Sequence, residues 1–351
     1  MVKSRIFQGI LFLLLMYGCH NKGTAYSFND FPQTSYLSGK VENISLRING
    51  AFLECVDSFL VLTTLPDYPW QVLLLDLKTF DHISSAGPVG EGPAEIGAIG
   101  LSLADPSSRI IWYHDIGKNR LLKFTIDSIL RDTSYFPGKP VPLKGLFMPL
   151  QLSAFNDSVL AYSGVVPESF VSFISTDGLI IDSLSVPSSG GLYHQEDMSF
   201  ESMVYLSYYS FLINRARSRI AIVYKYSDAI DIINFKGEVI LRIIGPGRIN
   251  QIPDYKTVNP IMTNTITKCD EDFIYCLYKN NRRFDESSAF LPIYDSMMNV
   301  FSWDGKPLLQ LRFSYPAATF SIDRRNDRII TYSPEVNDLV TYSFDFDRLL
   351  N

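Results

Sequence analysis

The chain has 351 residues, a formal net charge of −6 and a hydrophobic fraction of 46%. It carries no basic run or stripe, which argues against a nucleic-acid-binding protein. Its 20 Tyr and 24 Phe residues favour strands, and helical periodicity is scarce beyond the N-terminus.

The first 19 residues have the layout of an export signal. Lys3 and Arg5 precede an apolar segment, residues 6–16, that is too short to span a bilayer. The sequence MYGC that follows resembles a bacterial lipobox, in which Cys19 would carry the lipid. We therefore predict a lipoprotein signal peptide over 1–19, a flexible polar tether over 20–37, and a protein anchored in the cell envelope at the outer membrane. A plain secretory peptide with an incidental cysteine is the alternative.

A pattern of a polar turn followed by a β-rich apolar run recurs along the rest of the chain. The first apolar residues of the six copies are Phe59, Ile110, Val159, Ile220, Phe273 and Ile329, with steps of 51, 49, 61, 53 and 56 residues. A second apolar run follows in each copy, and three of these runs end in the hairpin turns DG at 177–178, KG at 236–237 and DG at 304–305. The clearest copy, residues 211–245, predicts a four-stranded meander.

Six units of this kind predict an all-β fold, a six-bladed β-propeller of four-stranded antiparallel blades over residues 38–351. A two-sheet sandwich is the alternative, but it does not predict a fixed period. The last unit shows only three strands. We expect residues 41–48 to supply the missing strand beside residues 339–344 and so close the ring.

Two segments resemble the TolB-like six-bladed propeller lipoproteins of Bacteroidetes. One reads GPVGEGPAEIG at 87–97, and the other reads DIGKNRLLKF at 115–124, followed by Asp127 and Ser128. The resemblance covers nearly the whole chain and implies a six-bladed fold and an exported lipoprotein. It implies no settled activity.

The glycine-rich segment is not expected to bind nucleotides. Glu91 and Glu95 lie where a phosphate loop would need a positive charge, and a strand follows at 99–104 instead of a helix. We interpret the segment as a crossover between blades, in which these glutamates either cap loop amides or contact a ligand.

Catalytic and metal-binding patterns are sparse. His82, His114 and His194 lie in different units, and neither a nucleophile elbow nor a calcium loop is present. We therefore predict no catalytic residue, no metal and no cofactor. Cys269 and Cys276 could pair across a hairpin, although buried free thiols are the simpler interpretation.

Long loops on one face of a propeller are the expected site of function. Aromatic and arginine side chains there suit protein, peptide or sugar contacts, although they could equally cover loops and pair with local acids. The candidate ligand-binding residues are Trp70, Glu91, Glu95, His114, Arg120, His194, Arg248 and Arg282.

Two functions remain open from the sequence. The first is a membrane-tethered, non-enzymatic binding or scaffold propeller that recognises a protein or glycan partner through its long-loop face. The second is a propeller enzyme, a lyase or hydrolase, with its site at the central channel. The lack of a catalytic motif favours the first.

Overall fold

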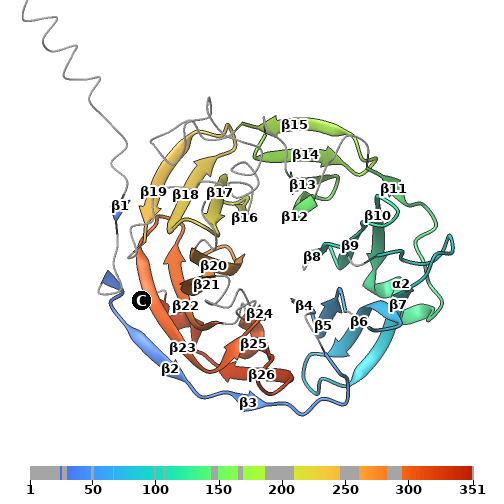
Figure 1. The fold of residues 1–351 in the computed structure, drawn as a ribbon, viewed down its shortest axis with the longest axis horizontal. Helices are drawn as coiled ribbons and strands as arrows, with labels where there is room; N and C mark the ends of the chain where they lie inside the picture. Colours follow the sequence, from blue (N-terminus) through green and yellow to red (C-terminus); the bar gives the residue numbers. More distant parts are fainter. Residues whose placement is uncertain are drawn as a thin grey trace, which may run out of the picture.

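The computed structural model describes residues 24–25, 30–48, 51–65, 67–98, 100–105, 108–143, 149–164, 169–185, 209–245, 261–282 and 295–349. Six antiparallel sheets stand around a central channel as the blades of a propeller (Figure 1). Each blade begins with the strand nearest the channel and continues outward through three more. The predicted six-bladed fold is therefore confirmed.

The first three blades follow one another along the chain. Blade 1 contains β4 (Phe52–Val56), β5 (Phe59–Thr63), β6 (Trp70–Asp76) and β7 (His82–Pro88). Blade 2 contains β8 (Ser102–Asp105), β9 (Ile110–Asp115), β10 (Arg120–Thr125) and β11 (Val141–Pro142). Blade 3 contains β12 (Pro149–Asn156), β13 (Val159–Gly164), β14 (Val171–Ser175) and β15 (Ile180–Leu184).

The last three blades follow in the same order, and blade 6 takes its fourth strand from the N-terminal segment. Blade 4 contains β16 (Tyr209–Asn214), β17 (Arg219–Tyr224), β18 (Ala229–Asn234) and β19 (Val239–Ile244). Blade 5 contains β20 (Ile261–Cys269), β21 (Phe273–Arg282), β22 (Asp295–Ser302) and β23 (Pro307–Ala317). Blade 6 contains β24 (Thr319–Asp323), β25 (Arg328–Ser333), β26 (Asp338–Ser343) and β3 (Lys40–Val41).

The sequence repeat corresponds to the second strand of every blade. The six apolar runs form β5, β9, β13, β17, β21 and β25, and the runs after them form the third strands. The predicted hairpin turns are also present. Gly178, Gly237 and Gly305 have φ values of +81°, +83° and +77°, a region that glycine enters without a steric penalty.

The hydrophobic core is divided into clusters that lie between neighbouring blades. Val61 and Leu74 of blade 1 pack with Ile111 and Leu122 of blade 2, and a cluster of the same kind fills each of the other five interfaces. A blade therefore buries its two apolar faces only when it has a neighbour on each side.

The ring closes through the N-terminal part of the chain, but with a shorter strand than predicted. Val41 pairs with Val340, Lys40 pairs with Thr341, and residues 42–48 form no strand. The apolar residues of that segment instead pack between blades 6 and 1, where Ile48 is fully buried and Ile44 lies against the same cluster. The alternation that predicted a strand therefore reflects packing at the closing interface.

Part of the predicted tether belongs to the fold. β1 (Thr24–Ala25) pairs in parallel with β19, and β2 (Thr34–Leu37) pairs in parallel with β23, so the segment follows the outer edges of blades 4, 5 and 6 (Figure 1). Phe31 is buried and its ring packs against Phe301, with centroids 5.5 Å apart. A strand can join the edge of a sheet through its backbone hydrogen bonds alone, without an apolar side-chain pattern. A polar segment of this kind therefore suggests a free tether when only the sequence is known. We call the described residues of this segment, 24–25 and 30–41, the strap.

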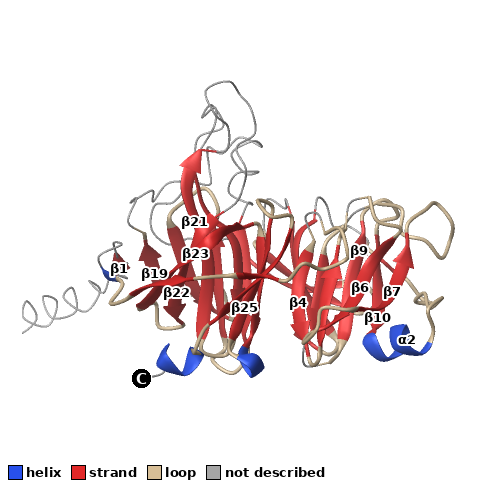
Figure 2. Ribbon diagram, turned by 90° about the horizontal axis from the view of Figure 1, so that it is seen from below, coloured by secondary structure: helices blue, strands red, loops and turns tan. Residues whose placement is uncertain are grey.

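The two faces of the ring differ in their connections. Helix α2 (Ile126–Arg131) and the 3₁₀ helix η4 (Phe346–Leu349) lie on one face, together with the turn that holds η3 (Arg324–Asn326) (Figure 2). We call this the helix face, and the opposite one, where blade 1 crosses to blade 2, the crossover face. Within the described residues, no helix has the length and apolar character needed to cross a bilayer.

Candidate ligand-binding site in the central channel

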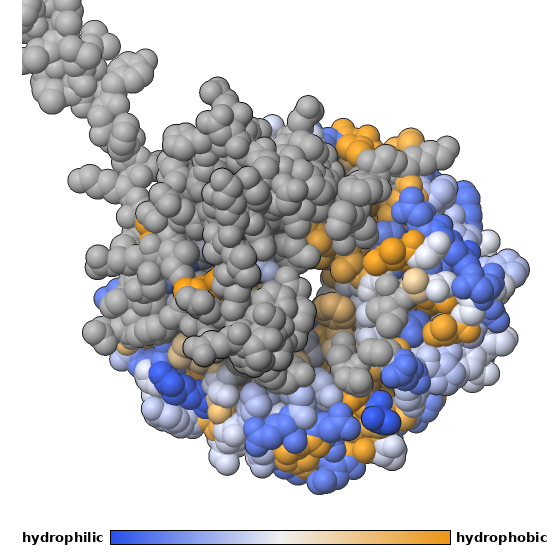
Figure 3. Space-filling view, viewed as in Figure 1, coloured by the Kyte–Doolittle hydropathy of each residue, from blue (hydrophilic) through white to orange (hydrophobic). Residues whose placement is uncertain are grey.

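The innermost strands of all six blades enclose a cavity of about 420 Å³ in the central channel. Figure 3 shows the hollow at the centre of the ring, with apolar side chains beside it. Each innermost strand runs from the crossover face to the helix face. Its first residues therefore lie near the crossover mouth of the channel, and its last residues lie near the helix-face mouth. A volume of this size is typical of a small-ligand pocket.

Aliphatic side chains make up much of the cavity wall. Phe52, at the crossover end of β4, is 42% exposed although it is a large apolar residue. The other apolar lining residues include Leu101, Leu103, Leu150, Leu152, Leu212, Ile213 and Ile266. Such a surface favours the apolar part of a ligand because its burial removes that surface from water.

Three of the charged groups in the cavity wall already have partners. Lys268 of β20 forms an ion pair with Glu54 of β4, so their side chains meet across the inner edge of blade 6. Asp105, at the end of β8, accepts a hydrogen bond of 2.6 Å from the Ser108 hydroxyl. These contacts brace the channel wall.

Lys225 is the exception. It lies in the turn between β17 and β18 and lines the cavity, yet among the described residues no hydrogen-bond acceptor or carboxylate contacts its ammonium group. Burial lowers the pKa of Lys225 below the usual lysine value. Blade 5 holds this turn in place, because the Thr263 amide of β20 donates to the Lys225 carbonyl at 2.8 Å and the Thr263 hydroxyl donates to the Ser227 carbonyl at 2.8 Å.

Two hydroxyl groups of the wall also lack partners. The Oγ1 atoms of Thr267 and Thr319 are buried and form no hydrogen bond within the described part of the chain. A buried polar atom without a partner is costly, and a bound ligand is one way of satisfying it. These two hydroxyls lie behind the surface of the wall, so the cavity itself combines aliphatic and hydroxyl side chains with one cation that has no counter-charge among the described residues.

The two segments that suggested a family resemblance form one structural unit between blades 1 and 2. Lys118 inserts its ammonium group into the glycine-rich crossover and donates to the carbonyls of Gly90, Gly92 and Glu95, at 3.1, 2.7 and 2.8 Å. The Glu95 carboxylate accepts from the Gly92 amide at 2.6 Å. The crossover interpretation, with a glutamate capping a loop amide, agrees with this geometry.

Arg120 belongs to the same unit. Its guanidinium donates to Asp115 at 3.1 Å, to the Pro93 carbonyl at 3.1 Å and to the Glu95 carbonyl at 2.6 Å, and it lies over the Phe136 ring. These contacts hold the crossover against blade 2. Arg120 and Glu95 are therefore part of the scaffold between blades 1 and 2.

Replacing Lys118 by methionine is expected to destabilise the protein by about 2 kcal/mol, because three carbonyls lose a charged donor. Lys139→Met is the matched control, since Lys139 is exposed and its side chain makes no contact with the described part of the chain. Urea unfolding of both variants measures the difference. Equal unfolding midpoints for the two variants would show that the crossover does not depend on Lys118.

The other predicted site residues do not converge with this unit. His114 is 2% exposed, and neither ring nitrogen has a hydrogen-bond partner among the described residues. Because Asp115 pairs with Arg120 and His114 with Leu121, the histidine points to the opposite side of blade 2. Burial lowers its pKa. Trp70 is half-buried at the start of β6, and Glu91 is exposed in the crossover.

The remaining predicted residues cannot be placed in the site. Cys19, His194 and Arg248 lie outside the described residues, and Arg282 ends β21 with a side chain that is not described. Cys55, Cys269 and Cys276 are free thiols, and burial raises the pKa of Cys55 and of Cys269 to about 12. Within the described ranges, no group of His, Cys, Asp or Glu side chains is placed to hold a metal ion.

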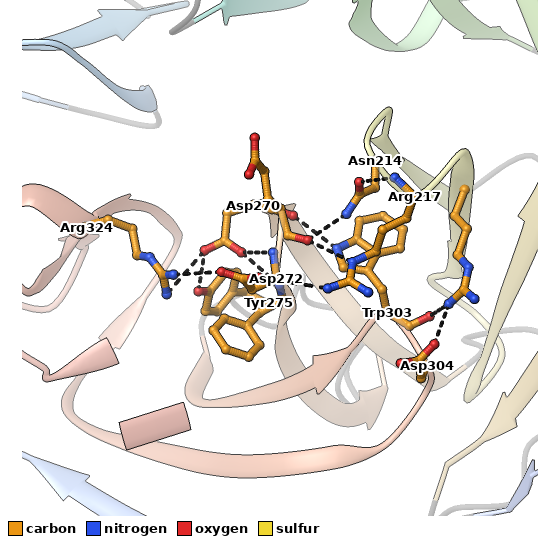
Figure 4. Close-up of polar contacts among 11 residues, drawn as sticks. Asn214, Arg217, Asp270, Asp272, Tyr275, Trp303, Asp304 and Arg324 are labelled. Atoms are coloured by element: carbon orange, nitrogen blue, oxygen red, sulfur yellow. Dashed lines mark hydrogen bonds and ion pairs between the residues drawn. The ribbon is translucent and has the colours of Figure 1, made fainter. Parts of the chain in front are cut away.

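A second polar cluster lies on the helix face, where blades 4, 5 and 6 meet (Figure 4). Asp270 accepts from the Phe273 amide at 2.8 Å and from the Tyr275 hydroxyl at 2.7 Å. Arg324 donates to Asp272 at 3.1 Å, and the Trp303 indole donates to the Asp270 carbonyl at 3.0 Å. These contacts join side chains from blades 5 and 6, although Arg324 Nη1 has only a 3.7 Å ion pair with Asp270, so we assign the cluster to holding the blades together.

Sequence reasoning missed Lys225, Lys268 and Glu54. The signal was a charged residue inside or next to a short apolar strand, as in FLECV at 52–56 and IAIVYK at 220–225. In a propeller such a residue avoids the core only by facing the channel or the outer rim. The sequence does not say which of these it faces until the innermost strands are known.

Comparison with known proteins supports the fold. No protein-family profile matches the sequence, and no curated protein matches it. A predicted exported protein from Bacteroides fragilis is similar in structure, with a TM-score of 0.54 and 11% identity over 91% of this chain and 99% of that chain. A member of the DUF4221 family from Bacteroides vulgatus has a TM-score of 0.51 and 11% identity over 90% and 94% of the two chains.

At this identity the likeness shows the propeller fold alone. The structural neighbours include an exported protein and a DUF4221 protein of Bacteroides. At the level of the propeller fold, this agrees with the resemblance to Bacteroidetes propellers seen in the sequence. Membership of the TolB-like lipoproteins stays a prediction.

Proposed function

We propose that the protein is a non-enzymatic binding propeller of the cell envelope, anchored at the outer membrane by a lipid on Cys19. Its partner, a protein or a glycan, is recognised at the crossover face and inserts one group into the central cavity. The observation that carries the proposal is the cavity itself, in which Lys225 has no counter-charge among the described residues. The N-terminal sequence and the exported Bacteroides neighbour support the location.

The choice of face rests on which polar groups are already satisfied. On the helix face, Asp270, Asp272 and Arg324 are engaged with one another and with neighbouring backbone. Lys225 lies at the opposite mouth, because β17 runs from the helix face to the crossover face and ends immediately before it. A partner that approaches the crossover face therefore meets the available charge first.

The proposal is tested by filling the cavity. Ser153→Trp places a large side chain in the wall of the channel, and Ser183→Trp makes the same change on the exposed outer strand β15. We expect partner capture from solubilised envelope membranes, or binding on a glycan array, to be lost in Ser153→Trp and retained in Ser183→Trp. Matching thermal unfolding curves show that both variants are folded.

Two outcomes would contradict the proposal. Capture that survives Ser153→Trp places recognition elsewhere on the molecule. Turnover of a substrate by the wild-type protein that is abolished by Lys225→Met would favour the enzyme, since a lysine with a lowered pKa is a suitable base or nucleophile.

A further inference from the structure

The cavity wall carries two acidic and two basic side chains, placed at different ends of the channel. Its charged side chains are Glu54, Asp105, Lys225 and Lys268. Lys268 is paired with Glu54, and Asp105 is bonded to Ser108. Lys225 is the one cation of the wall without a partner among the described residues, and it lies at the crossover mouth, whereas Asp105 ends β8 near the helix face. The crossover end of the cavity therefore favours an anion over a neutral or cationic group.

The rest of the wall restricts what can carry that anion. Aliphatic residues are the largest group in the lining, beside hydroxyl residues such as Ser102, Ser153 and Ser210, and its only aromatic residues are Phe52 and Phe211. The Gln151 side chain, which could otherwise bind a sugar hydroxyl, is engaged at both ends with the Phe211 backbone, at 2.8 and 2.9 Å. A sugar needs many hydrogen bonds and a flat ring to stack on, whereas an alkyl body needs neither. The wall therefore suits an apolar body.

We infer that the cavity binds an apolar monocarboxylate, with the carboxylate paired to Lys225 and the alkyl body against the aliphatic wall. The inference rests on the proposed function and names the chemistry of the inserted group. Two sources share this chemistry: a small organic acid, and the C-terminus of a peptide that ends in apolar residues.

At pH values above the lowered pKa of Lys225, binding of this ligand is coupled to proton uptake. Burial lowers the pKa of Lys225 in the free protein, and an anion beside it stabilises the charged form and raises that pKa again. Between these two values the complex holds one more proton than the free protein, so affinity falls as pH rises through the pKa of Lys225. The Cys269 thiol also lines the cavity, but its pKa of about 12 keeps it neutral there.

The test compares acids with their neutral amides on the folded, full-length protein. Octanoate and octanamide represent the small acid, and a pentapeptide ending in Leu-Ile, with a free or an amidated C-terminus, represents the peptide. Isothermal titration is carried out in two buffers of different ionisation enthalpy, so that proton uptake is measured directly. The variants are Lys225→Met, which removes the charge, Lys225→Arg, which keeps it, and Lys139→Met as the surface control.

We expect the wild-type protein to bind one of the two acids at least about tenfold more tightly than its amide. Lys225→Met should abolish this preference and the proton uptake, whereas Lys225→Arg should keep the preference and lose only the proton uptake. Binding of octanoate would identify a small organic acid as the ligand, and binding of the peptide with a free C-terminus would identify a peptide C-terminus. An amide that binds as tightly as its acid, or a preference that survives in Lys225→Met, overturns the inference.

Failure here is distinct from failure of the proposed function. A neutral or cationic ligand whose binding is blocked by Ser153→Trp overturns the monocarboxylate while the binding propeller stands. Partner capture that is insensitive to Ser153→Trp overturns the proposed function, whereas acid-selective binding that depends on Lys225 would still support the monocarboxylate.

Discussion

Replacing Arg242 by alanine is expected to destabilise the protein by about 3–5 kcal/mol, because the Asp231 carboxylate is then buried without its counter-charge. In blade 4 the Asp231 side chain is 0% exposed and the Arg242 side chain 10% exposed. Arg242 Nε and Nη2 donate to the two carboxylate oxygens at 2.5 and 2.7 Å, and the Tyr224 hydroxyl donates to Oδ2 at 3.0 Å. Urea unfolding followed by tryptophan fluorescence measures the loss.

Two variants serve as controls for this result. Arg348→Ala breaks an exposed ion pair with Asp345, 3.1 Å long, and should cost less than about 1 kcal/mol. The double variant Asp231→Leu/Arg242→Met removes both charges, and should be more stable than Arg242→Ala alone. If Arg348→Ala were as damaging as Arg242→Ala, burial would not be the cause of the effect.

Gly100→Ala is expected to destabilise the protein by about 3 kcal/mol or more, since overpacking at a rigid backbone contact is at the upper end of such effects. A Cβ atom at Gly100 would lie 1.5 Å from the His114 backbone carbonyl oxygen. The glycine is also held on both sides, because its amide donates to the Tyr113 hydroxyl and its carbonyl accepts from the Thr64 hydroxyl, each at 3.0 Å. The backbone therefore has little room to shift.

Gly138→Ala is the matched control for this substitution. A Cβ atom at Gly138 would meet no heavy atom within 4 Å, so the change should alter stability by less than about 1 kcal/mol. Thermal unfolding followed by circular dichroism compares the two variants. A wild-type melting temperature for Gly100→Ala would mean that the crossover between blades 1 and 2 is looser than the structure indicates.

The sequence predicted the blades well because their second strands combine two independent signals. A polar turn fixes where each run begins, and a β-rich apolar run of similar length follows it, as at Phe59 and Phe273. Hairpin glycines such as Gly237 then fix where the outer strand starts. These features are local, so each can be seen without knowing the rest of the fold.

The strap could not be predicted in this way. Its residues 34–37 join β23 through backbone hydrogen bonds, and the pairing leaves Tyr36 79% exposed. Nothing in the side chains requires that arrangement, except Phe31, which packs against blade 5. Residues 42–48 were wrongly predicted to form a strand for the opposite reason. Their apolar side chains alternate because they pack between blades 6 and 1, and not because the backbone pairs with a neighbouring strand.

The candidate site was the least predictable part. Lys225, Glu54 and Thr319 come from blades 4, 1 and 6, and only the closed ring brings them to one cavity. The residues that the sequence did suggest, Glu95 and Arg120, share a local motif and meet within it. Local patterns thus identified a structural crossover, whereas the channel depends on segments more than 250 residues apart (319 − 54 = 265).

The strap also limits how far the propeller can stand from a bilayer. If Cys19 carries the predicted lipid, it lies five residue-to-residue steps from Thr24 (24 − 19 = 5), a reach of at most about 17 Å. β1 attaches Thr24 to the rim of blade 4, so the rim approaches the lipid first and the hub lies about one blade width, roughly 20 Å, beyond it. With the predicted lipid in place, whatever docks at the hub therefore does so within about 40 Å of the membrane surface.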